Sequence, residues 1–561
     1  MRKHLPDLAV TTTVALAVLG PLLLGSGFWL AGDMVFVPDQ PWKSAWLGLD
    51  GALPRAVPMD ALVSLASYVV PGALVQKALL LGGFLAGGLG AARVVREQAW
   101  FARAAAIVLF CWNPWVHERL LIGQWAILLG YLLLPWVALA ALRLRRDPRD
   151  IAPAAVVLVL AAVCSPSSGL MAVGVLAVLG LTGDRRGWWR AALVAVVANL
   201  PWLVPALLAD AVRVSTDGVF AGFAARAESG AGTLASVLSL GGIWKTSILA
   251  GERTSALLVL LSCLLSLAAL AGLWRGAPDR GRWLGLGGAA VVLALLPTTS
   301  PGADLLEQLG DVVPGVALLR DSHRFLAPLG LVLAVGAAHA TTLVRAQVRP
   351  GRGALWSGVA LLVVAPVLLL PSLAWGGGGA IERSSYPAAW EEVADIVGPD
   401  DVTVVLPWAG SYRGFDWSHR RAMLDPAPRF LPGTVLVDDS VLLTDIVVPP
   451  EDPRVVAVAE ALAASDPATE LRALGVRWVL VERGTGAIEA PAAPVRYDAG
   501  GLTLRDLAAD GPVATGPTTV RPAVARSQEI LVILGHGLAF LLLLAGAAWI
   551  LRPGSNERHT T

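Results

Sequence analysis

Two aspartates near the start of the chain are the residues best suited to catalysis. The stretch 32–43 carries Asp33, Asp39 and Lys43 beside two aromatic residues, directly after the first apolar run. A carboxylate held near a substrate hydroxyl can act as a general base. Asp33 and Asp39 are therefore candidate catalytic bases. The alternative is a solvated loop whose Asp and Pro residues form turns.

Two further short runs mix arginine, histidine and carboxylate side chains. They are His117, Glu118 and Arg119 in one run, and Arg320, Asp321, His323 and Arg324 in the other. The planar guanidinium of arginine donates two hydrogen bonds to a phosphate at once. We therefore expect Arg320, Arg324 and Arg119, with Lys77, to bind a phosphate. The remaining members of the two runs, together with Lys43, are candidate substrate-binding residues.

Each of these assignments has a structural alternative. The run 117–119 can be an ordinary solvated turn. Arg320 and Arg324 can anchor a helix at a membrane interface, and Asp321 can form a weak surface pair with either of them. Lys77 can extend its ammonium from an apolar helix toward the interface.

The composition determines the class of protein that carries these residues. The chain has 561 residues, of which 56% are hydrophobic and 15% charged, and its mean hydropathy is +0.66. These values indicate a polytopic membrane protein and exclude a soluble enzyme. The net charge of +1 argues against nucleic-acid binding. The three cysteines lack metal-ligand spacing. The residues assign no cofactor, and a divalent cation is left open.

About twelve apolar segments are candidate membrane spans. They are 8–30, 71–93, 100–116, 122–142, 151–164, 167–182, 188–209, 254–274, 283–298, 325–347, 354–375 and 528–551. The pair 151–164 and 167–182 is short, so it is either two spans or one re-entrant hairpin. Arg2, Lys3 and His4 precede the first run without a clear cleavage site after it, so we expect a retained first helix.

The loops between these segments predict the orientation. Every second loop is rich in arginine, which places those loops and both termini in the cytoplasm by the positive-inside rule. The protein is then a multi-pass plasma-membrane protein with a transmembrane domain at 1–375. Its longer outer loops are 31–70, 210–253 and 299–324, and its cytoplasmic tail is 552–561.

A second domain is expected at 376–527, outside the cell and before the final span at 528–551. The glycine run 376–379 indicates a flexible boundary. Short apolar strands then alternate with helices, which is typical of a small α/β domain. Within this domain, 408–413 and 416–421 mix aromatic and charged residues. That composition suits carbohydrate contact and equally suits an exposed loop.

The whole pattern resembles the GT-C superfamily of membrane glycosyltransferases. The stretches that carry the resemblance are the acidic first loop 32–39, Asn113-Pro114-Trp115 and Gly123-Gln124-Trp125 leading to 133–136, the run 319–325, and the α/β domain. It is most similar to the arabinofuranosyl- and mannosyltransferases of mycobacterial-type cell envelopes. The resemblance therefore implies a GT-C-like helical fold with an extracytoplasmic α/β domain.

The resemblance also implies an activity. Such enzymes are inverting transferases that use a polyprenyl-phosphate sugar donor at the outer face of the bilayer and glycosylate a cell-envelope glycan or glycolipid. A first-loop aspartate is the base, which implies Asp33 or, failing that, Asp39. Two other functions remain open on sequence alone: a transporter or flippase of lipid-linked sugars, and a non-catalytic scaffold for envelope assembly.

Overall fold

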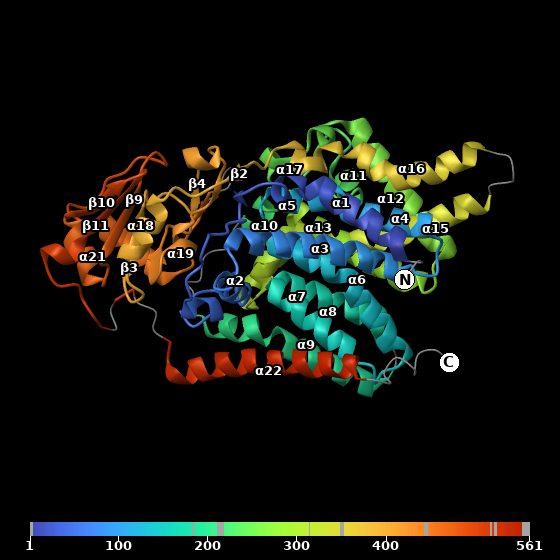
Figure 1. Ribbon diagram of the computed structural model, residues 1–561. Helices are drawn as coiled ribbons and strands as arrows, with labels where there is room; N and C mark the ends of the chain where they lie inside the picture. The colour runs from blue at the N-terminus through green and yellow to red at the C-terminus, as the bar shows by residue number, and fades with distance from the viewer. Residues whose placement is uncertain are drawn as a thin grey trace.

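The computed structural model describes residues 4–181, 184–209, 218–313, 315–347, 353–442, 447–516, 519–520 and 524–552. Within them, a large helical part is joined to a smaller part that contains a β-sheet (Figure 1). We call the helices before residue 379, together with the final helix Arg526–Leu551, the helical body. We call residues 383–510 the α/β domain. The proposed domain boundaries at 375 and 527 remain predictions.

Long apolar helices form the frame of the helical body. They are α1 (Leu5–Leu23), α3 (Gly72–Val94), α6 (Trp125–Arg146), α9 (Arg185–Leu208), α12 (Ala256–Gly276), α13 (Arg280–Leu295), α15 (Ala327–Ala346) and α22 (Arg526–Leu551). Among the described residues, these and their adjoining turns give eight helices long and apolar enough to cross a membrane. A ninth span results if the pair 358–369 and 371–378, bent by 65°, counts as one.

Shorter helices complete the body. They are α2 (Met59–Ser67), α4 (Trp100–Cys111), α5 (Pro114–Leu121), α7 (Ala152–Cys164), α8 (Pro166–Gly180), α10 (Val219–Gly222), α11 (Thr233–Leu238), α14 (Ser300–Val312), α16 (Gly353–Leu369) and α17 (Ala374–Gly378). Each predicted span contains a helix, but twelve spans are not confirmed, because α4, α7, α8 and α16 are short. Local caps divide the apolar sequence: Asn113 caps α5 and Ser165 caps α8, each before a proline.

The helices run roughly parallel to one another (Figure 1). Helix α22 lies along α9, although more than 300 residues separate them in the sequence. Helix α1 begins and α22 ends at the end of the helical body that is farther from the α/β domain (Figure 1). The final helix therefore returns the chain along much of the body.

The α/β domain is built on a five-stranded sheet in the order β10-β11-β9-β3-β6. Its strands are β3 (Val402–Leu406), β6 (Thr434–Leu436), β9 (Trp478–Glu482), β10 (Val495–Ala499) and β11 (Leu502–Asp506). Strand β3 is parallel to β6 and β9, whereas β11 is antiparallel to β9 and β10. The domain's helices are α18 (Ala389–Ile396), α19 (Ala427–Phe430), α20 (Pro453–Leu462) and α21 (Pro467–Ala473).

Side chains of the central strands alternate between two apolar layers. On β3, Val402, Val404 and Leu406 pack with α20 and α21 on one face of the sheet. Val405 points to the other face and joins a core that contains Trp390 of α18. This alternation follows from the two-residue repeat of a strand. The predicted α/β class is therefore found, with helices on both faces of the sheet.

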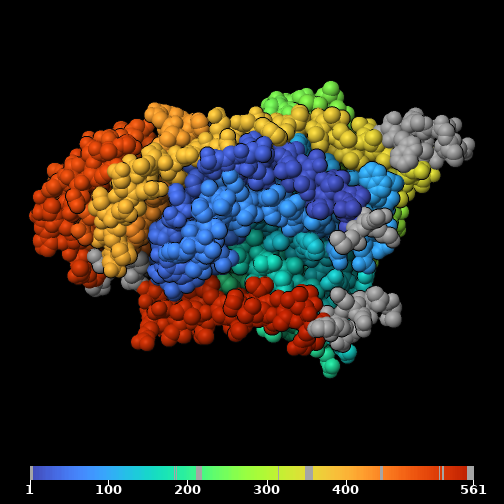
Figure 2. Space-filling model, viewed as in Figure 1, coloured from blue at the N-terminus to red at the C-terminus, as the bar shows by residue number. Residues whose placement is uncertain are grey.

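Short strands connect the α/β domain to the segment that follows α1. They are β1 (Phe28–Trp29), β2 (Arg383–Ser384), β4 (Tyr412–Arg413) and β5 (Met423–Leu424), while β7 (Val441–Leu442) and β8 (Val447–Val448) form a separate hairpin. Strand β1 pairs with β2. The Gly32 backbone N–H donates to Ala422 O at 2.9 Å, and Leu424 N–H donates to Gly32 O at 2.8 Å. Figure 2 shows the blue segment after α1 packed against the orange α/β domain.

The glycine run between the two parts is packed rather than extended. Gly376 and Gly377 have φ angles of +71° and +73°, a conformation that glycine adopts without strain. A Cβ at Gly376 would lie 2.6 Å from the Trp29 ring, and one at Gly377 would lie 2.5 Å from Leu121. The expected flexible boundary is thus a tight left-handed turn against the helical body.

Two glycines bring the first loop against the turn after α5. Gly32 has φ +53° and Gly123 has φ +80°. A Cβ at Gly32 would lie 1.9 Å from Ile122 O, and one at Gly123 would lie 1.9 Å from Ala31 O. Asp33 N–H donates to Ile122 O at 3.0 Å. This backbone contact sets Asp33 beside the end of α5.

We predict that Gly32→Ala lowers the free energy of unfolding by about 2–5 kcal/mol, the sum of backbone strain and a steric clash. Gly51→Ala is the matched control, because Gly51 has φ +77° but no atom within 4 Å of its Cβ position. The control should cost about 1–2 kcal/mol. Apparent unfolding temperatures in detergent compare the two. Equal losses would show that the contact adds nothing to stability.

Candidate active site

Asp33 lies at the junction of the helical body and the α/β domain. Residues 29–37 are buried except for Asp33, which is partly exposed. One carboxylate oxygen, Oδ1, accepts a hydrogen bond of 2.5 Å from the Tyr412 hydroxyl on β4. The alternative of a solvated loop is therefore wrong for residues 32–37, because the neighbours of Asp33 pack into the core.

Tyr412 is surrounded by charged groups from three parts of the chain. Lys245 Nζ lies 5.5 Å from the centre of its ring. Burial raises the pKa of Tyr412, the Asp33 carboxylate raises it further, and Arg324 and Arg55 act in the opposite direction. Long-range charge effects require these groups to lie nearby. One carboxylate and three cations therefore converge around this ring.

Arg324 belongs to a buried network of ion pairs. Asp321 Oδ2 accepts from Arg324 Nε at 2.7 Å and from Arg119 Nη1 at 3.3 Å. Burial alone would raise the pKa of Asp321, but the Arg324 and Arg119 charges lower it to about 2. The carboxylate is thus ionised and shared between two guanidinium groups. Asp321 does not form the weak surface pair that was the alternative.

His323 completes this network as a neutral imidazole. Its Nδ1 lies 2.6 Å from Arg119 Nη2, and its Nε2 lies 3.0 Å from Gly241 O. A guanidinium only donates and a carbonyl only accepts, so Nδ1 is the acceptor and Nε2 carries the hydrogen. His323 therefore orients Arg119 rather than supplying a charge.

The run 117–119 is buried on α5 and is not a solvated turn. His117, Glu118 and Arg119 are at most 2% exposed. The pKa of Glu118 lies well above its usual value, mainly because the side chain is buried and secondly because the Glu228 carboxylate is nearby. Glu228 Oε2 accepts from Arg253 Nε at 3.0 Å. Burial lowers the pKa of His117 to about 4. These buried groups are paired or uncharged, so they would affect a substrate only indirectly.

Arg320 belongs to a set of ion pairs between the two parts of the molecule. Its Nη1 lies 3.4 Å from Glu451 Oε1. Arg55 Nη2 lies 2.9 Å from Glu451 Oε2 and 3.1 Å from Asp439 Oδ2. Asp438, the neighbour of Asp439, accepts from the Gly410 backbone N–H at 2.6 Å. The Glu451 and Asp439 carboxylates thus bind the α/β domain to Arg55 and Arg320, whereas Asp438 bonds within the domain.

Three predicted site residues lie apart from this network in their described contacts. Lys77 donates to Gly25 O. Lys43 donates to Pro428 O at 2.8 Å, and burial, with the Arg429 charge second, lowers its pKa to about 7. Asp39 is exposed. Asp33, Arg324, Asp321, Arg119 and His323 are brought together, whereas Lys77, Lys43 and Asp39 are not seen to join them.

Sequence reasoning missed several residues of this site as participants. They are Tyr412, Lys245, Arg55, Glu228, Arg253 and Glu451. The only signal was the mixed aromatic and charged stretch 408–413, which contains Tyr412. Asp33 and Tyr412 are 379 residues apart, so no local pattern could pair them.

The residues of the site do not form a metal centre. Among the described residues, no group of three or more His, Cys, Asp or Glu side chains is placed to hold a metal ion. Asp33 has a tyrosine hydroxyl and cations as neighbours, and Asp439 is paired with Arg55. These surroundings do not fit a divalent cation, and we derive no step through one.

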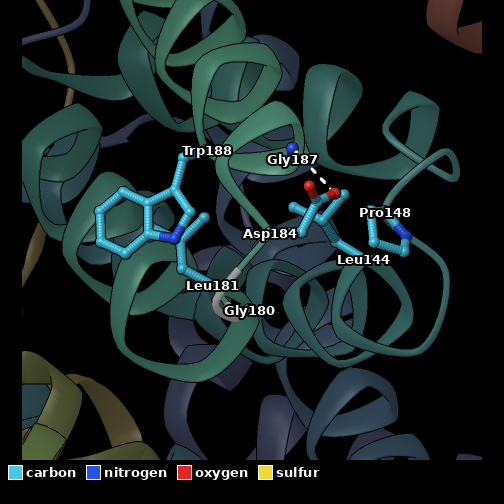
Figure 3. A pocket seen from close by; sticks show the side chains of 7 residues that line it. All are labelled: Leu144, Pro148, Gly180, Leu181, Asp184, Gly187 and Trp188. Atoms are coloured by element: carbon cyan, nitrogen blue, oxygen red, sulfur yellow. Dashed lines mark hydrogen bonds between the residues drawn. The ribbon is translucent and has the colours of Figure 1, made fainter.

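A small pocket lies elsewhere, between α6, α8 and the start of α9 (Figure 3). Its empty volume is about 190 Å³, part of it open to solvent. The carboxylate of its Asp184 accepts from the backbone N–H groups of Arg186 and Gly187, both at 3.1 Å. That carboxylate therefore serves as the cap of α9. The other lining residues are mainly apolar, so this pocket offers no reactive group.

The fold is similar to cryo-EM structures of the arabinofuranosyltransferase AftD from Mycobacteria. One has a TM-score of 0.56 and 17% identity, covering 89% of this chain and 39% of that chain. A mutant of the same protein gives 0.56 and 17%, covering 89% and 41%. This chain thus spans about two fifths of the length of that protein. The sequence matches no protein-family model and no curated protein.

These likenesses establish the class of fold. The chain is a multi-pass membrane protein whose helices and small sheet region are arranged as in that arabinofuranosyltransferase. The fold implied by the sequence resemblance is confirmed at this level. Identity of 17% shows the fold alone, so the activity rests on the site.

We predict that Asp321→Asn lowers the free energy of unfolding by about 3–5 kcal/mol, because it leaves Arg119 buried without its counter-charge. The control is Glu97→Gln, which removes an exposed pair with Arg96 at 2.9 Å and should cost about 0–1 kcal/mol. Apparent unfolding temperatures at pH 7 test both. A loss no larger than the control's would contradict a structural role for the network.

The same variant has a defined pH dependence. The pKa of Asp321 is about 2 in the folded protein, against 3.8 for an ordinary aspartate. A lowered pKa stabilises the folded state above about pH 4 and loses that contribution as the pH falls through 2. The difference between wild type and Asp321→Asn should therefore be constant from pH 7 to about 4 and shrink below it.

Proposed function

We propose that this protein is an inverting membrane glycosyltransferase. It would transfer a sugar from a polyprenyl-phosphate donor to a cell-envelope glycan or lipid acceptor at the extracytoplasmic face. The observation that carries the proposal is the partly exposed Asp33 carboxylate, which is hydrogen-bonded to Tyr412, with Lys245 against the tyrosine ring and the Arg324 charge acting on the same phenol. A base next to cations is what transfer from a lipid phosphate requires. The GT-C-like fold supports the same class.

Asp33 would act as the general base. The acceptor hydroxyl gives its proton to the carboxylate while its oxygen bonds to the anomeric carbon of the donor sugar. The bond from that carbon to the phosphate oxygen breaks, and its electron pair leaves with the phosphate. The backbone bonds of Gly32 and Asp33 to both parts of the molecule support this role, because they restrict where the carboxylate lies.

Arg324 is the arginine best suited to the leaving phosphate. Its Nε is bound to Asp321, and its side chain is 24% exposed, which leaves guanidinium N–H groups for a ligand. Arg119 is fully buried, so it would act indirectly by holding Asp321. Arg320 is partly exposed but engaged by Glu451. Lys245 adds a further positive charge beside Tyr412.

Asp33→Asn should lower the rate of sugar transfer by about 10²–10⁴-fold, which is the usual contribution of a general base. Asp39→Asn is the control, because Asp39 is a first-loop aspartate of the same type that is exposed and outside the network. The control should keep its rate within a few-fold. Transfer of labelled sugar in proteoliposomes measures both. A large loss of rate in Asp39→Asn but not in Asp33→Asn would make Asp39 the base. Full activity in both variants would show that neither aspartate is the base.

Arg324→Gln should lower kcat/KM for the donor by about 10²–10³-fold, because a preorganised donor to the developing phosphate charge is lost. Arg96→Gln, at an exposed arginine in a pair with Glu97, is the control. Steady-state kinetics with a synthetic polyprenyl-phosphate sugar test both. An unchanged donor kcat/KM in Arg324→Gln would exclude this residue from phosphate binding.

A further inference from the structure

The hydrogen bond between Tyr412 and Asp33 has the geometry expected of a hydrogen bond between an acceptor hydroxyl and a general base. The phenolic O–H donates to Asp33 Oδ1 at 2.5 Å. A general base needs a substrate hydroxyl within about 2.6–3.2 Å of its oxygen. The tyrosine hydroxyl therefore stands where an acceptor hydroxyl would stand. It comes from the α/β domain, whereas Asp33 comes from the helical body.

Tyr412 occupies this position as a neutral phenol. Burial and the Asp33 carboxylate both raise its pKa above the usual value for a phenol. The phenol stays protonated at neutral pH, so it donates its hydrogen bond without giving up the proton. It therefore fills the base's acceptor position with a neutral hydroxyl of the protein itself.

The backbone of Tyr412 is held firmly, whereas the residue is partly exposed to solvent. Strand β4 pairs with β5, which in turn bonds to Gly32, the residue before Asp33. The next residue, Arg413, is buried and binds Glu482 at 3.0 Å. Tyr412, by contrast, is 39% exposed as a residue. Rotation of this side chain would free Asp33 without separating the two parts of the molecule.

Cations flank the ring that would move. Lys245 Nζ faces the ring at 5.5 Å, and Arg324 and Arg55 are close enough to favour the ionised phenol. Cations at this position suit an anionic donor beside the base. An acceptor that displaces the tyrosine would therefore enter next to the groups that hold the donor phosphate.

We propose that Tyr412 is a cap on Asp33 that mimics the acceptor hydroxyl, and that a hydroxyl-bearing acceptor sugar must displace it. This inference rests on the proposed function. While the cap is in place, water cannot bond to Asp33 Oδ1 at the same position. Without it, a water molecule can give its proton to Asp33 and attack the anomeric carbon, which releases free sugar and the lipid phosphate. The cap thus protects the donor from hydrolysis until an acceptor arrives.

Tyr412→Phe tests the cap because it removes only the hydroxyl. Release of free sugar from a synthetic polyprenyl-phosphate arabinofuranose, without acceptor, should rise about tenfold or more, as expected from a lost hydrogen bond to a charged group. With acceptor, KM for the acceptor should fall while kcat stays within a few-fold. A fall in kcat with unchanged KM and unchanged hydrolysis would overturn the cap and make Tyr412 a positioning residue for the base.

Tyr386→Phe is the matched control. The Tyr386 hydroxyl also connects the α/β domain to the first loop, by donating to Phe36 O at 3.0 Å, but its described contacts do not include Asp33. This variant should leave donor hydrolysis and acceptor KM at the wild-type values. An equal rise in hydrolysis in both variants would assign the effect to loosening of the domain contact and overturn the cap.

A second readout does not depend on activity. Carbodiimide with glycine ethyl ester labels accessible carboxylates, and mass spectrometry measures the labelling rate at Asp33. The rate should increase in Tyr412→Phe and stay at the wild-type value in Tyr386→Phe. An unchanged rate overturns the cap. If Asp33 labelling increases but no protein, wild type included, transfers or hydrolyses the donor, the proposed function fails while the capping contact stands.

Discussion

The backbone contact between Gly32 and Gly123 is the constraint on which the site depends. Neither residue can carry a Cβ in this arrangement, because the added atom would lie 1.9 Å from a carbonyl oxygen of the other segment. The contact brings the first loop to the end of α5. There, Asp33 contacts Tyr412, and α5 also carries Arg119 of the buried network, which pairs with Asp321 in the turn before α15. A close approach of two backbone segments thus substitutes for a long rigid element in positioning the candidate base.

The buried charges of the helical body obey a second constraint. A charge removed from water must be paired, or it becomes neutral. Asp321 stays ionised because two guanidinium groups share it, whereas burial and a neighbouring carboxylate favour the protonated form of Glu118. His323 is neutral because its two neighbours require one donor and one acceptor. The network therefore holds Arg324 at the edge of the interior, with part of its guanidinium left for a ligand.

The α/β domain is part of the candidate site rather than an appendage. Its β2 strand pairs with β1, its β5 strand bonds to Gly32, and its carboxylates bind Arg55 and Arg320. Two of the groups expected from sequence to meet substrate, Arg320 and Asp33, are thus engaged by this domain. A site built from two parts can respond to an acceptor that contacts either part.

The apolar composition, and the order of helix-like and strand-like segments along the sequence, determined the class of this protein without any structure. Long apolar runs must leave water, and short strands alternating with helices must form a layered α/β unit. The twelve spans expected from hydropathy are not confirmed, because Asn113 and Ser165 cap short helices within apolar sequence. The chemistry of Asp33, Arg324 and Asp321 was visible from their residue types. Their grouping followed from spacing only where they are neighbours in sequence, as for Asp321 and Arg324.

Only the tertiary structure decided which of these groups meet. Asp33 and Tyr412 are 379 residues apart, and Arg119 and Asp321 are 202 apart. Such pairs are set by which helices pack together and by where glycines allow two backbones to touch. A single sequence specifies these contacts only through the energy of the whole fold, so local patterns cannot reveal them. The sequence by itself thus determined the membrane class and the candidate reactive groups. Packing decided that Asp33 lies against Tyr412, that Asp39 stays exposed, and that Arg119 is buried as a support.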